Sequence, residues 1–303
     1  MGRKESENML DIMGKRKIFF IISTVIILTG IITMLAAGLN QDIDFTGGTA
    51  FHFNIGQEFE NEEISQLVEE VIGFEPSTVQ RAGEAGTEVI IKTREIDTDT
   101  RDQVFERLKE EYGLDPETDR LGSENFNETI GQELKNQAFL ATIIAAILML
   151  AFITIRFEFR SGVAAVIALM HDLLVMLTVY TLFRIPINTT FIAAMLTILG
   201  YSINDTIVVF DRIRENTKKM RKDKFAHVVN TSIWQTIARS INTSITTLVT
   251  IVALYILGVP SIKEFAFPLI IGILSGMYSS IFIASPVWVM WKEFEQKRKV
   301  KTA

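Results

Sequence analysis

At 303 residues, with 48% hydrophobic residues and a mean hydropathy of +0.28, the chain is too apolar to be an ordinary soluble domain. It contains no cysteine and 3 histidines, which excludes disulfides, thiolate metal sites and a histidine-rich metal site. The net charge of −6 is unevenly distributed, because residues 39–136 hold 24 acidic and 8 basic residues while the remainder is basic.

Six segments are long and apolar enough to cross a bilayer, at roughly 20 residues each. In chain order, the predicted transmembrane segments are residues 18–38, 137–155, 162–183, 189–210, 241–257 and 265–290. The first has a basic flank and ends near Ala36-Ala37-Gly38, which resembles a signal-peptide cleavage site. Its apolar region is longer than that of a usual signal peptide, and cleavage would leave an odd number of spans. We therefore expect this segment to be retained.

Basic residues predict the orientation of these segments through the positive-inside rule. The segments 1–17, 156–161, 211–240 and 291–303 together hold 20 basic residues, against 10 on the opposite side. We therefore expect a multi-pass protein of the cytoplasmic membrane whose two termini are cytoplasmic. The acidic region 39–136 is then external.

The acidic region 39–136 alternates between strand-like and helix-like patterns. Strand patterns cover residues 48–55, 78–82 and 88–93, with a last strand between 114 and 126, and amphipathic helix patterns cover 60–71 and 100–112. The order β-α-β-β-α-β is that of a ferredoxin-like split βαβ unit. The predicted fold is a polytopic α-helical membrane protein with six transmembrane helices and one inserted α+β ferredoxin-like external domain.

Asp205 is the main candidate for chemistry, because it lies inside the predicted span 189–210. A carboxylate there is costly unless it meets water, a partner or a proton. Counted from Asp211 at 1.5 Å per residue, it lies about 9 Å inside the predicted cytoplasmic boundary. The polar residues beside it are Ser202, Asn204 and Thr206. The pattern predicts an ion or proton relay, with a structural hydrogen bond between helices as the alternative.

Arg239 begins the fifth predicted span and is a candidate partner for Asp205. Its long side chain reaches inward, so an ion pair with Asp205 is one interpretation and a snorkelling anchor is the other. Thr243 lies one turn deeper, where its hydroxyl either lines a path for water or bonds back to its own helix. The spacing leaves both alternatives open.

Asp172 is a weaker relay candidate, in the third predicted span. Counted from Arg160, it lies about 18 Å deep, near the bilayer midplane. Its neighbour His171 allows an equally good alternative, in which the two residues form a neutral structural pair.

Two further features have structural interpretations. Tandem glycines suit a tight backbone turn after the first span, which predicts a structural turn motif. That motif consists of Asp44, Phe45, Thr46, Gly47 and Gly48. Together with Asp42, Asp44 offers too few ligands for calcium, and we predict no metal site.

The stretch 211–240 is densely basic at its start and then carries an apolar stripe. The stripe consists of Val228, Val229, Ile233, Trp234 and Ile237. It predicts an interfacial helix on the inner leaflet, with an ordinary cytoplasmic helix packed against loops as the alternative.

Four segments together resemble the SecF family of bacterial protein-export membrane subunits. They are DFTGGT from Asp44, TIGQELKNQA from Thr129, LGYSINDTIVVFDRIREN from Leu199 and SSIFIASPV from Ser279. The resemblance runs from the first span to the last, and the block from GYSINDT to REN is highly specific. The related SecD proteins fit less well, since their first external region is much larger.

The resemblance implies a six-helix half-bundle of the RND superfamily that pairs with SecD and helps late protein export, powered by inward ion flow. The implied partners are SecD, the SecYEG channel, a YidC-type insertase, the exported unfolded polypeptide and H⁺ or Na⁺, without nucleic acid or cofactor. In that family, the acid of the GYSxND motif and an arginine at the start of the fifth span matter for ion conduction. These map onto Asp205 and Arg239. The surrounding polar groups would be Ser202, Asn204, Thr206 and Thr243, with Asp172 as a weaker member of the relay.

Other function classes remain as alternatives. A non-conducting scaffold that stabilises SecD or the channel would tolerate Asp205→Asn but not the loss of residues 40–132. A complete efflux pump fits poorly, because such pumps carry two six-helix halves and two large external domains. No nucleophile, phosphate loop or metal cluster in the sequence argues for an enzyme. The residues do not distinguish H⁺ from Na⁺ as the coupling ion.

Overall fold

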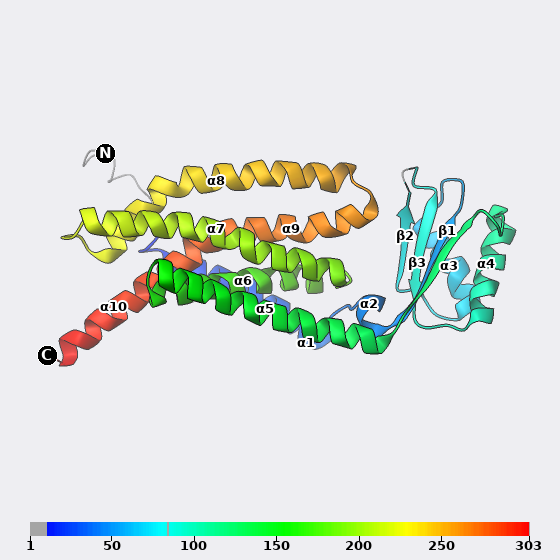
Figure 1. The fold of residues 1–303 in the computed structure, drawn as a ribbon, viewed down its shortest axis with the longest axis horizontal. Helices are drawn as coiled ribbons and strands as arrows, with labels where there is room; N and C mark the ends of the chain where they lie inside the picture. Colours follow the sequence, from blue (N-terminus) through cyan, green and yellow to red (C-terminus); the bar gives the residue numbers. More distant parts are fainter. Residues whose placement is uncertain (1–10, 84, 303) are drawn as a thin grey trace.

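The computed structural model describes residues 11–83 and 85–302. Long helices form a bundle, and a small α+β domain stands at one end of it (Figure 1). Within the described residues, six helical segments have the length and apolarity to cross a membrane, as the sequence predicts. Residues 1–10 of the predicted cytoplasmic segment 1–17 lie outside the described residues, as does Ala303 at the end of the predicted tail.

The bundle has three central helical segments and three peripheral ones. The peripheral segments are α1 (Arg16–Ala37), α5 (Glu128–Arg156) and α8 (Phe225–Leu257). The central ones are α6 (Phe159–Leu182), α7 (Thr189–Lys219) and a continuous segment that consists of α9 (Pro260–Ser279), the π turn η2 (Ser280–Ala284) and α10 (Ser285–Thr302). Within their most apolar stretches, α6, α7 and the α9–α10 segment are 44% to 61% buried, against 6% to 11% for α1, α5 and α8. About half of each of α6, α7 and the α9–α10 segment therefore faces protein, whereas α1, α5 and α8 offer most of their apolar surface to lipid or to a partner.

The basic stretch 211–240 differs from the prediction of a separate interfacial helix. In the structure α7 continues to Lys219, and α8 runs without a break from Phe225 through the predicted fifth span. The stripe residues Val229 and Ile233 are buried in one cluster with side chains of α7 and α10. Burial between helices satisfies this apolar stripe, so it needs no membrane surface.

The last predicted span is longer than expected and contains a π turn. After η2 the helix continues as α10 to Thr302, through most of the predicted tail. Pro286 accounts for the irregular turn, because proline lacks an N–H group and its ring clashes with the carbonyl four residues earlier. The hydroxyl of Ser285 donates to the carbonyl of Ser280 at 3.1 Å, which satisfies that oxygen within the turn.

The α+β domain has the predicted element order. Its elements are β1 Gly48–Asn54, α3 Asn61–Ile72, β2 Thr78–Ala82, β3 Glu88–Thr93, α4 Thr98–Tyr112 and β4 Arg120–Phe126. The strands pair antiparallel in the order β2-β3-β1-β4, so β3 lies between β1 and β2 as in a split βαβ unit. Alternate residues of β1 and β3, such as Phe53 and Ile91, pack in one core with α3 and α4. The other face of the sheet is turned towards the bundle (Figure 1).

The predicted turn at residues 44–48 is present as a short helix followed by two glycines. The carboxylate of Asp42 caps α2 (Ile43–Thr46) by accepting a hydrogen bond from the first helical N–H at 2.7 Å. Gly47 has a φ of 76°, a conformation that favours glycine. At Gly48 a Cβ would lie 2.3 Å from the carbonyl oxygen of Thr93, so no side chain fits there.

The start of α5 differs from the predicted domain boundary at residue 136. Residues 128–136 are helical and continuous with the second span, and the side chain of Asn127 caps them with a hydrogen bond of 2.8 Å. Gly131 allows this first part of α5 to pack on α2, since a Cβ would lie 2.8 Å from the carbonyl oxygens of Asp44 and Phe45. The turn motif and the start of α5 therefore form one packed unit.

Candidate ion-relay site

Two aspartates lie inside the bundle. Asp205 on α7 is 3% exposed and Asp172 on α6 is 0% exposed. Within the described residues, neither forms an ion pair with a lysine or an arginine. A carboxylate buried without such a counterion depends on hydrogen bonds, or on binding a proton or a cation. The hydrogen-bond partners of each aspartate therefore determine what it can do.

Asp205 accepts hydrogen bonds only from hydroxyls of α8 in this part of the structure. Ser244 donates from Oγ to Oδ2 at 3.1 Å, and Thr243 approaches Oδ1 at 3.4 Å. The Thr243 hydroxyl lies closer to the backbone carbonyls of Arg239 and Ser240, at 3.0 Å each. Of the two alternatives for Thr243, bonding back to its own helix has the shorter distances, and the contact with Asp205 is weak.

The structure does not bring Arg239 to Asp205. Arg239 is exposed and lines a cavity of about 600 Å³ together with Asp211 and Glu215. It lies one turn before Thr243, so it shares the face of α8 that approaches Asp205. The predicted ion pair is absent from this arrangement of the helices, and forming it would require Arg239 to move inward.

Asp172 is held by hydrogen bonds from three serines and contacts a histidine. Its Oδ1 accepts from Ser275 at 2.6 Å, and its Oδ2 accepts from Ser202 at 2.6 Å and from Ser279 at 2.8 Å. The ring of His171 lies at 3.1 Å from Oδ1 through Nδ1. Asp172 on α6 thus connects α7 and α9, so the residue predicted to be the weaker candidate lies at the centre of the network.

A chain of polar groups leads from Asp172 to α1. The other nitrogen of His171, Nε2, lies 3.0 Å from the hydroxyl of Ser23, which donates to the hydroxyl of Tyr278 at 3.2 Å. Tyr278 in turn donates to the backbone carbonyl of Phe19 at 3.0 Å. The His171–Asp172 pair is therefore part of a hydrogen-bonded network across four helices.

Ser202 and Thr206 lie on the inner side of α7, near both acids, whereas Asn204 does not. Ser202 binds Asp172 and lies three residues before Asp205 on the same helix, and Thr206 shares a 2.8 Å hydrogen bond with Ser280 of η2. Asn204 is exposed, on the side of α7 away from these contacts. Its side chain contacts neither acid in this structure.

Serines supply the site residues that the sequence does not reveal. Serine is common at helix–helix contacts in membranes and stands out neither by charge nor by hydropathy. The four-residue spacing of two of them on α9 is the one local signal for a shared polar face. The unpredicted members of the site are Ser23, Ser244, Ser275, Tyr278 and Ser279.

Glycines on α9 allow the serines of α7 and α9 to reach Asp172 together. A Cβ on Gly276 would lie 3.0 Å from the side chain of Ser202, and one on Gly272 would lie 2.5 Å from Ile198. The backbones of α7 and α9 therefore approach more closely than larger residues permit. This close approach lets short hydroxyl side chains of both helices reach one carboxylate.

The arrangement suits the binding and release of a small cation or a proton. Hydroxyl groups contact both carboxylates, and their oxygen atoms can be ligands of hard cations or hydrogen-bond partners of a protonated acid. A protonated Asp172 would donate one hydrogen bond, so one of the serine hydroxyls that now donates to it would have to rotate and accept instead. Its protonation state is therefore linked to contacts among α6, α7 and α9.

Comparison with known proteins identifies the family. Residues 106–294 match the C-terminal part of the protein export membrane protein SecD/SecF family. The chain is 37% identical over 295 residues to protein translocase subunit SecF of Alicyclobacillus acidocaldarius, covering 96% of each. It is 38% identical over 292 residues to SecDF of Bacillus subtilis, covering 95% of this chain but 39% of that longer protein.

A solved structure supports the same relationship. The crystal structure of SecDF from Thermus thermophilus, a translocon-associated membrane protein, aligns with a TM-score of 0.80 at 34% identity, over 97% of this chain and 40% of that one. The super-membrane-facing form of SecDF aligns with a TM-score of 0.75. The likeness thus spans nearly the whole chain. The chain belongs to the SecD/SecF family of protein export membrane proteins and matches its SecF members along almost their full length.

Proposed function

We propose that this chain is the SecF-type accessory subunit of a Sec protein translocase and not an enzyme. Relatives of the same length are named translocase subunit SecF, and the longer relatives join such a segment to further sequence in one SecDF chain. A separate SecD-type chain is therefore the partner we propose here. Its proposed setting is the cytoplasmic membrane, with both termini inside and the α+β domain outside, facing the exported unfolded polypeptide near SecYEG and a YidC-type insertase.

The proposed mechanism couples an inward flow of H⁺ or Na⁺ to export through Asp205. The observation that carries it is a carboxylate buried between α7 and α8 whose hydrogen-bond partners, within the described residues, are two hydroxyls and no cation. Such a group is stable in this place when a proton or a cation neutralises it. On release, the charged form favours a second arrangement of α7 and α8 in which Arg239, one turn from Thr243, moves inward to pair with it.

Asp172 would transmit this change to the rest of the bundle. Ser202 joins it to α7, three residues from Asp205, while Ser275 and Ser279 join it to α9. A shift of α7 therefore alters the donors around Asp172. Movements of the helices would then reach the α+β domain, whose connecting turn packs on α5 and α7.

Export in cells that carry Asp205→Asn tests the proposal. The amide keeps the shape of the side chain but exchanges no proton and carries no charge, so export should fall to the level of cells that lack the protein. Asp211→Asn is the matched control, since this acid lies further along the same helix, half exposed and paired with Arg156. Normal export by Asp205→Asn at normal protein level would instead favour the non-conducting scaffold.

A further inference from the structure

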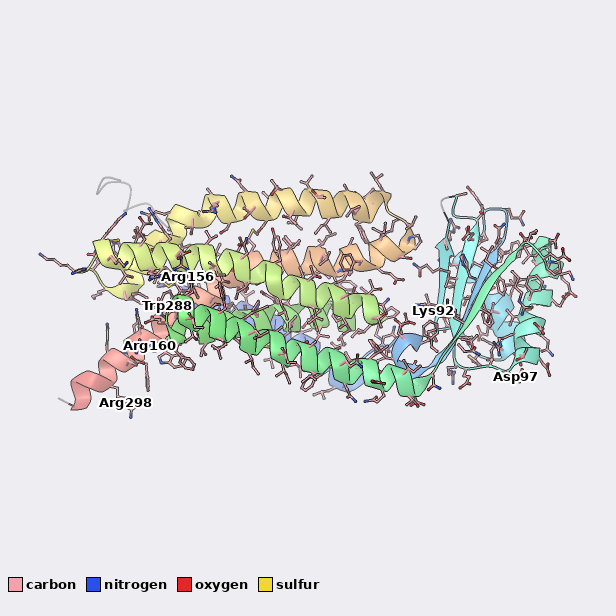
Figure 2. The ribbon with its side chains drawn as sticks, viewed as in Figure 1. Lys92, Asp97, Arg156, Arg160, Trp288 and Arg298 are labelled. Atoms are coloured by element: carbon pink, nitrogen blue, oxygen red, sulfur yellow. The ribbon has the colours of Figure 1, made fainter. Side chains whose placement is uncertain are left out.

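A small cavity opens at the end of the bundle opposite the α+β domain. Its volume is about 200 Å³, and the α5–α6 junction, the end of α7 and α10 form its walls. The labelled residues Arg156, Arg160 and Trp288 mark this region in Figure 2. The cavity is lined by Phe157, Glu158, Arg214, Thr217, Lys218, Trp288 and Lys292. The cavity is therefore several times larger than the roughly 30 Å³ that one water molecule takes up, and it can hold a larger group.

Glu158, the one acidic residue among those that line the cavity, is already paired with other residues of this chain. Glu158 Oε1 accepts from the indole N–H of Trp288 at 2.6 Å and from Lys292 at 3.2 Å, and its Oε2 lies 3.3 Å from Arg160. Lys292 also lies over the ring of Phe225, 4.1 Å from its centroid. Glu158 and Lys292 therefore form a fixed wall, and the charge of Lys292 is balanced locally.

Two other basic residues of the cavity have no acidic partner within the described residues. Arg214 donates to the backbone carbonyl of Arg156 at 3.1 Å, and Lys218 lies one turn further along α7 on the same face. Both side chains belong to exposed residues, whereas Arg156 is paired with Asp211 at 3.3 Å. The cavity therefore presents two uncompensated positive charges, which suit a phosphate group.

Exposed apolar residues flank the α5–α6 junction that forms one wall of the cavity. Ile155, at the end of α5, is 86% exposed, and Phe159, at the start of α6, is 54% exposed with its ring edge-on to Trp291. One turn before Ile155, Phe152 is also 54% exposed and continues the apolar surface along α5. Aromatic residues beside basic ones at the ends of membrane helices are typical of the headgroup level. A ligand with a phosphate and hydrocarbon chains matches both surfaces.

We propose that this cavity binds the headgroup phosphate of an anionic phospholipid, with Arg214 and Lys218 as its charge partners and an acyl chain along α5. Inorganic phosphate carries the same kind of charge as the lipid headgroup but has no hydrocarbon chain to cover the exposed side chains of Phe152 and Ile155. These exposed side chains therefore favour the lipid over free phosphate. A lipid bound here would fasten the end of α7 to α10 at the boundary of the membrane.

Native mass spectrometry of the full-length chain in detergent tests this proposal with phosphatidylglycerol, phosphatidylcholine and inorganic phosphate as probes. Phosphatidylglycerol should be retained in preference to phosphatidylcholine. Removing both charges with Arg214→Gln and Lys218→Gln should weaken retention by roughly fivefold per charge. The matched control is Arg221→Gln with Lys222→Gln, which removes the same charge from the turn after α7, outside the cavity, and should keep the affinity of the unmodified chain.

Three results would overturn the assignment. The first is an equal loss of phosphatidylglycerol in the Arg214/Lys218 and Arg221/Lys222 double variants. The second is equal retention of phosphatidylglycerol and phosphatidylcholine by the unmodified chain. The third is displacement of phosphatidylglycerol by inorganic phosphate at similar concentration. Circular dichroism checks that the variants keep their helix content. If the double variant is unstable, the single variant Lys218→Gln tests the proposal instead, and its retention of phosphatidylglycerol should fall by roughly fivefold.

Discussion

The two buried aspartates differ in how their charge is accommodated. Asp172 accepts from three serine hydroxyls at 2.6 to 2.8 Å, and hydrogen bonds to a charged group are stronger than those between neutral groups. Asp205 has one good hydroxyl donor and a second that is shared with backbone carbonyls. Asp172 is therefore held firmly, whereas Asp205 has capacity left for a proton or a cation.

We predict that Ser275→Ala and Ser279→Ala each destabilise the bundle. Each change removes a donor from a carboxylate that is 0% exposed, and leaving such a group short of a partner costs about 1–3 kcal/mol. Melting in detergent, followed by circular dichroism, measures the loss. Thr197→Ala is the control, because its exposed hydroxyl donates only to its own helix, to the carbonyl of Ala193. Unchanged melting of both serine variants would contradict the network.

At the scale of single residues, a charged residue in an apolar helix can be recognised from the sequence, whereas the residues that hydrogen-bond to it cannot. Asp205 stands out because a carboxylate interrupts an apolar helix, and the structure buries it as expected. The donors of Asp172 come from α7 and α9, distant in the chain, and serine carries no hydropathy signal. Arg239 shows a second limit, because depth along a helix does not fix the direction of a long side chain, and here Arg239 lines a cavity with Asp211 and Glu215.

At the scale of helices, the α7–α9 contact decides the geometry of the site. Gly272 faces Ile198, and Gly276 faces Ser202 on α7. The π turn that follows places Ser280 opposite Thr206. Packing and polar contacts are therefore parts of one interface, so a change in helix spacing alters the hydrogen bonds as well.

We predict that Gly272→Ala destabilises the bundle by separating α7 from α9. The new Cβ would lie 2.5 Å from the side chain of Ile198, a contact that neither side can relieve without moving, and overpacking of this kind costs about 1–3 kcal/mol. Gly200→Ala on α7 is the control, since its Cβ would meet nothing within 4 Å. Thermal melting of the two variants compares them directly, and equal melting temperatures would refute the close approach.

Helix existence follows from the sequence more readily than helix ends. Hydropathy finds each span, because length and apolarity alone define it. The stretch 211–240 has an apolar stripe that fits a membrane surface and a helix contact equally well. Only the packing of α7 and α10 against Val229 and Ile233 distinguishes the two alternatives. The start of α5 differs from the prediction for a similar reason, since its polar first turns are stabilised by packing on α2.

At the scale of the whole molecule, a few polar contacts fasten the α+β domain to the bundle. Lys92 of β3 (labelled in Figure 2) pairs with Asp42 at 2.6 Å, and their side chains are 16% and 4% exposed. Asp44 accepts hydrogen bonds from the backbone and the hydroxyl of Thr189 at 3.0 and 2.7 Å. A cavity of about 360 Å³ remains between β2 and the ends of α6 and α9. The domain is thus fastened at its connecting turn and less tightly packed elsewhere.

We predict that, as the pH is raised from neutral, this attachment weakens only when the solution becomes strongly alkaline. Burial lowers the pKa of Lys92, but the charge and hydrogen bond of Asp42 outweigh it and raise the pKa above its ordinary 10.5. The ion pair therefore contributes fully below about pH 10.5, and its contribution is lost as the pH rises through the raised pKa. Since the chain has no cysteine, spin labels at two introduced cysteines, one on the sheet and one on α9, report the separation of domain and bundle.

The substitution Lys92→Gln should loosen the domain already at neutral pH, because it leaves the buried Asp42 without its cation, at a cost of about 3 kcal/mol. The distance distribution between the labels should then broaden. Lys109→Gln is the control, because Lys109 pairs with Glu106 on the surface of α4. A distribution that stays narrow in Lys92→Gln would show that the other contacts suffice.

Ion-driven export in vesicles tests the role of Asp205 most directly. Vesicles that hold this chain with a SecD-type partner and the channel receive an inward pH gradient or an inward Na⁺ gradient while they export a polypeptide. We predict that one of these gradients stimulates export with the unmodified chain and with Asp211→Asn, and that neither does with Asp205→Asn. Stimulation of equal size in Asp205→Asn would contradict a relay through this carboxylate.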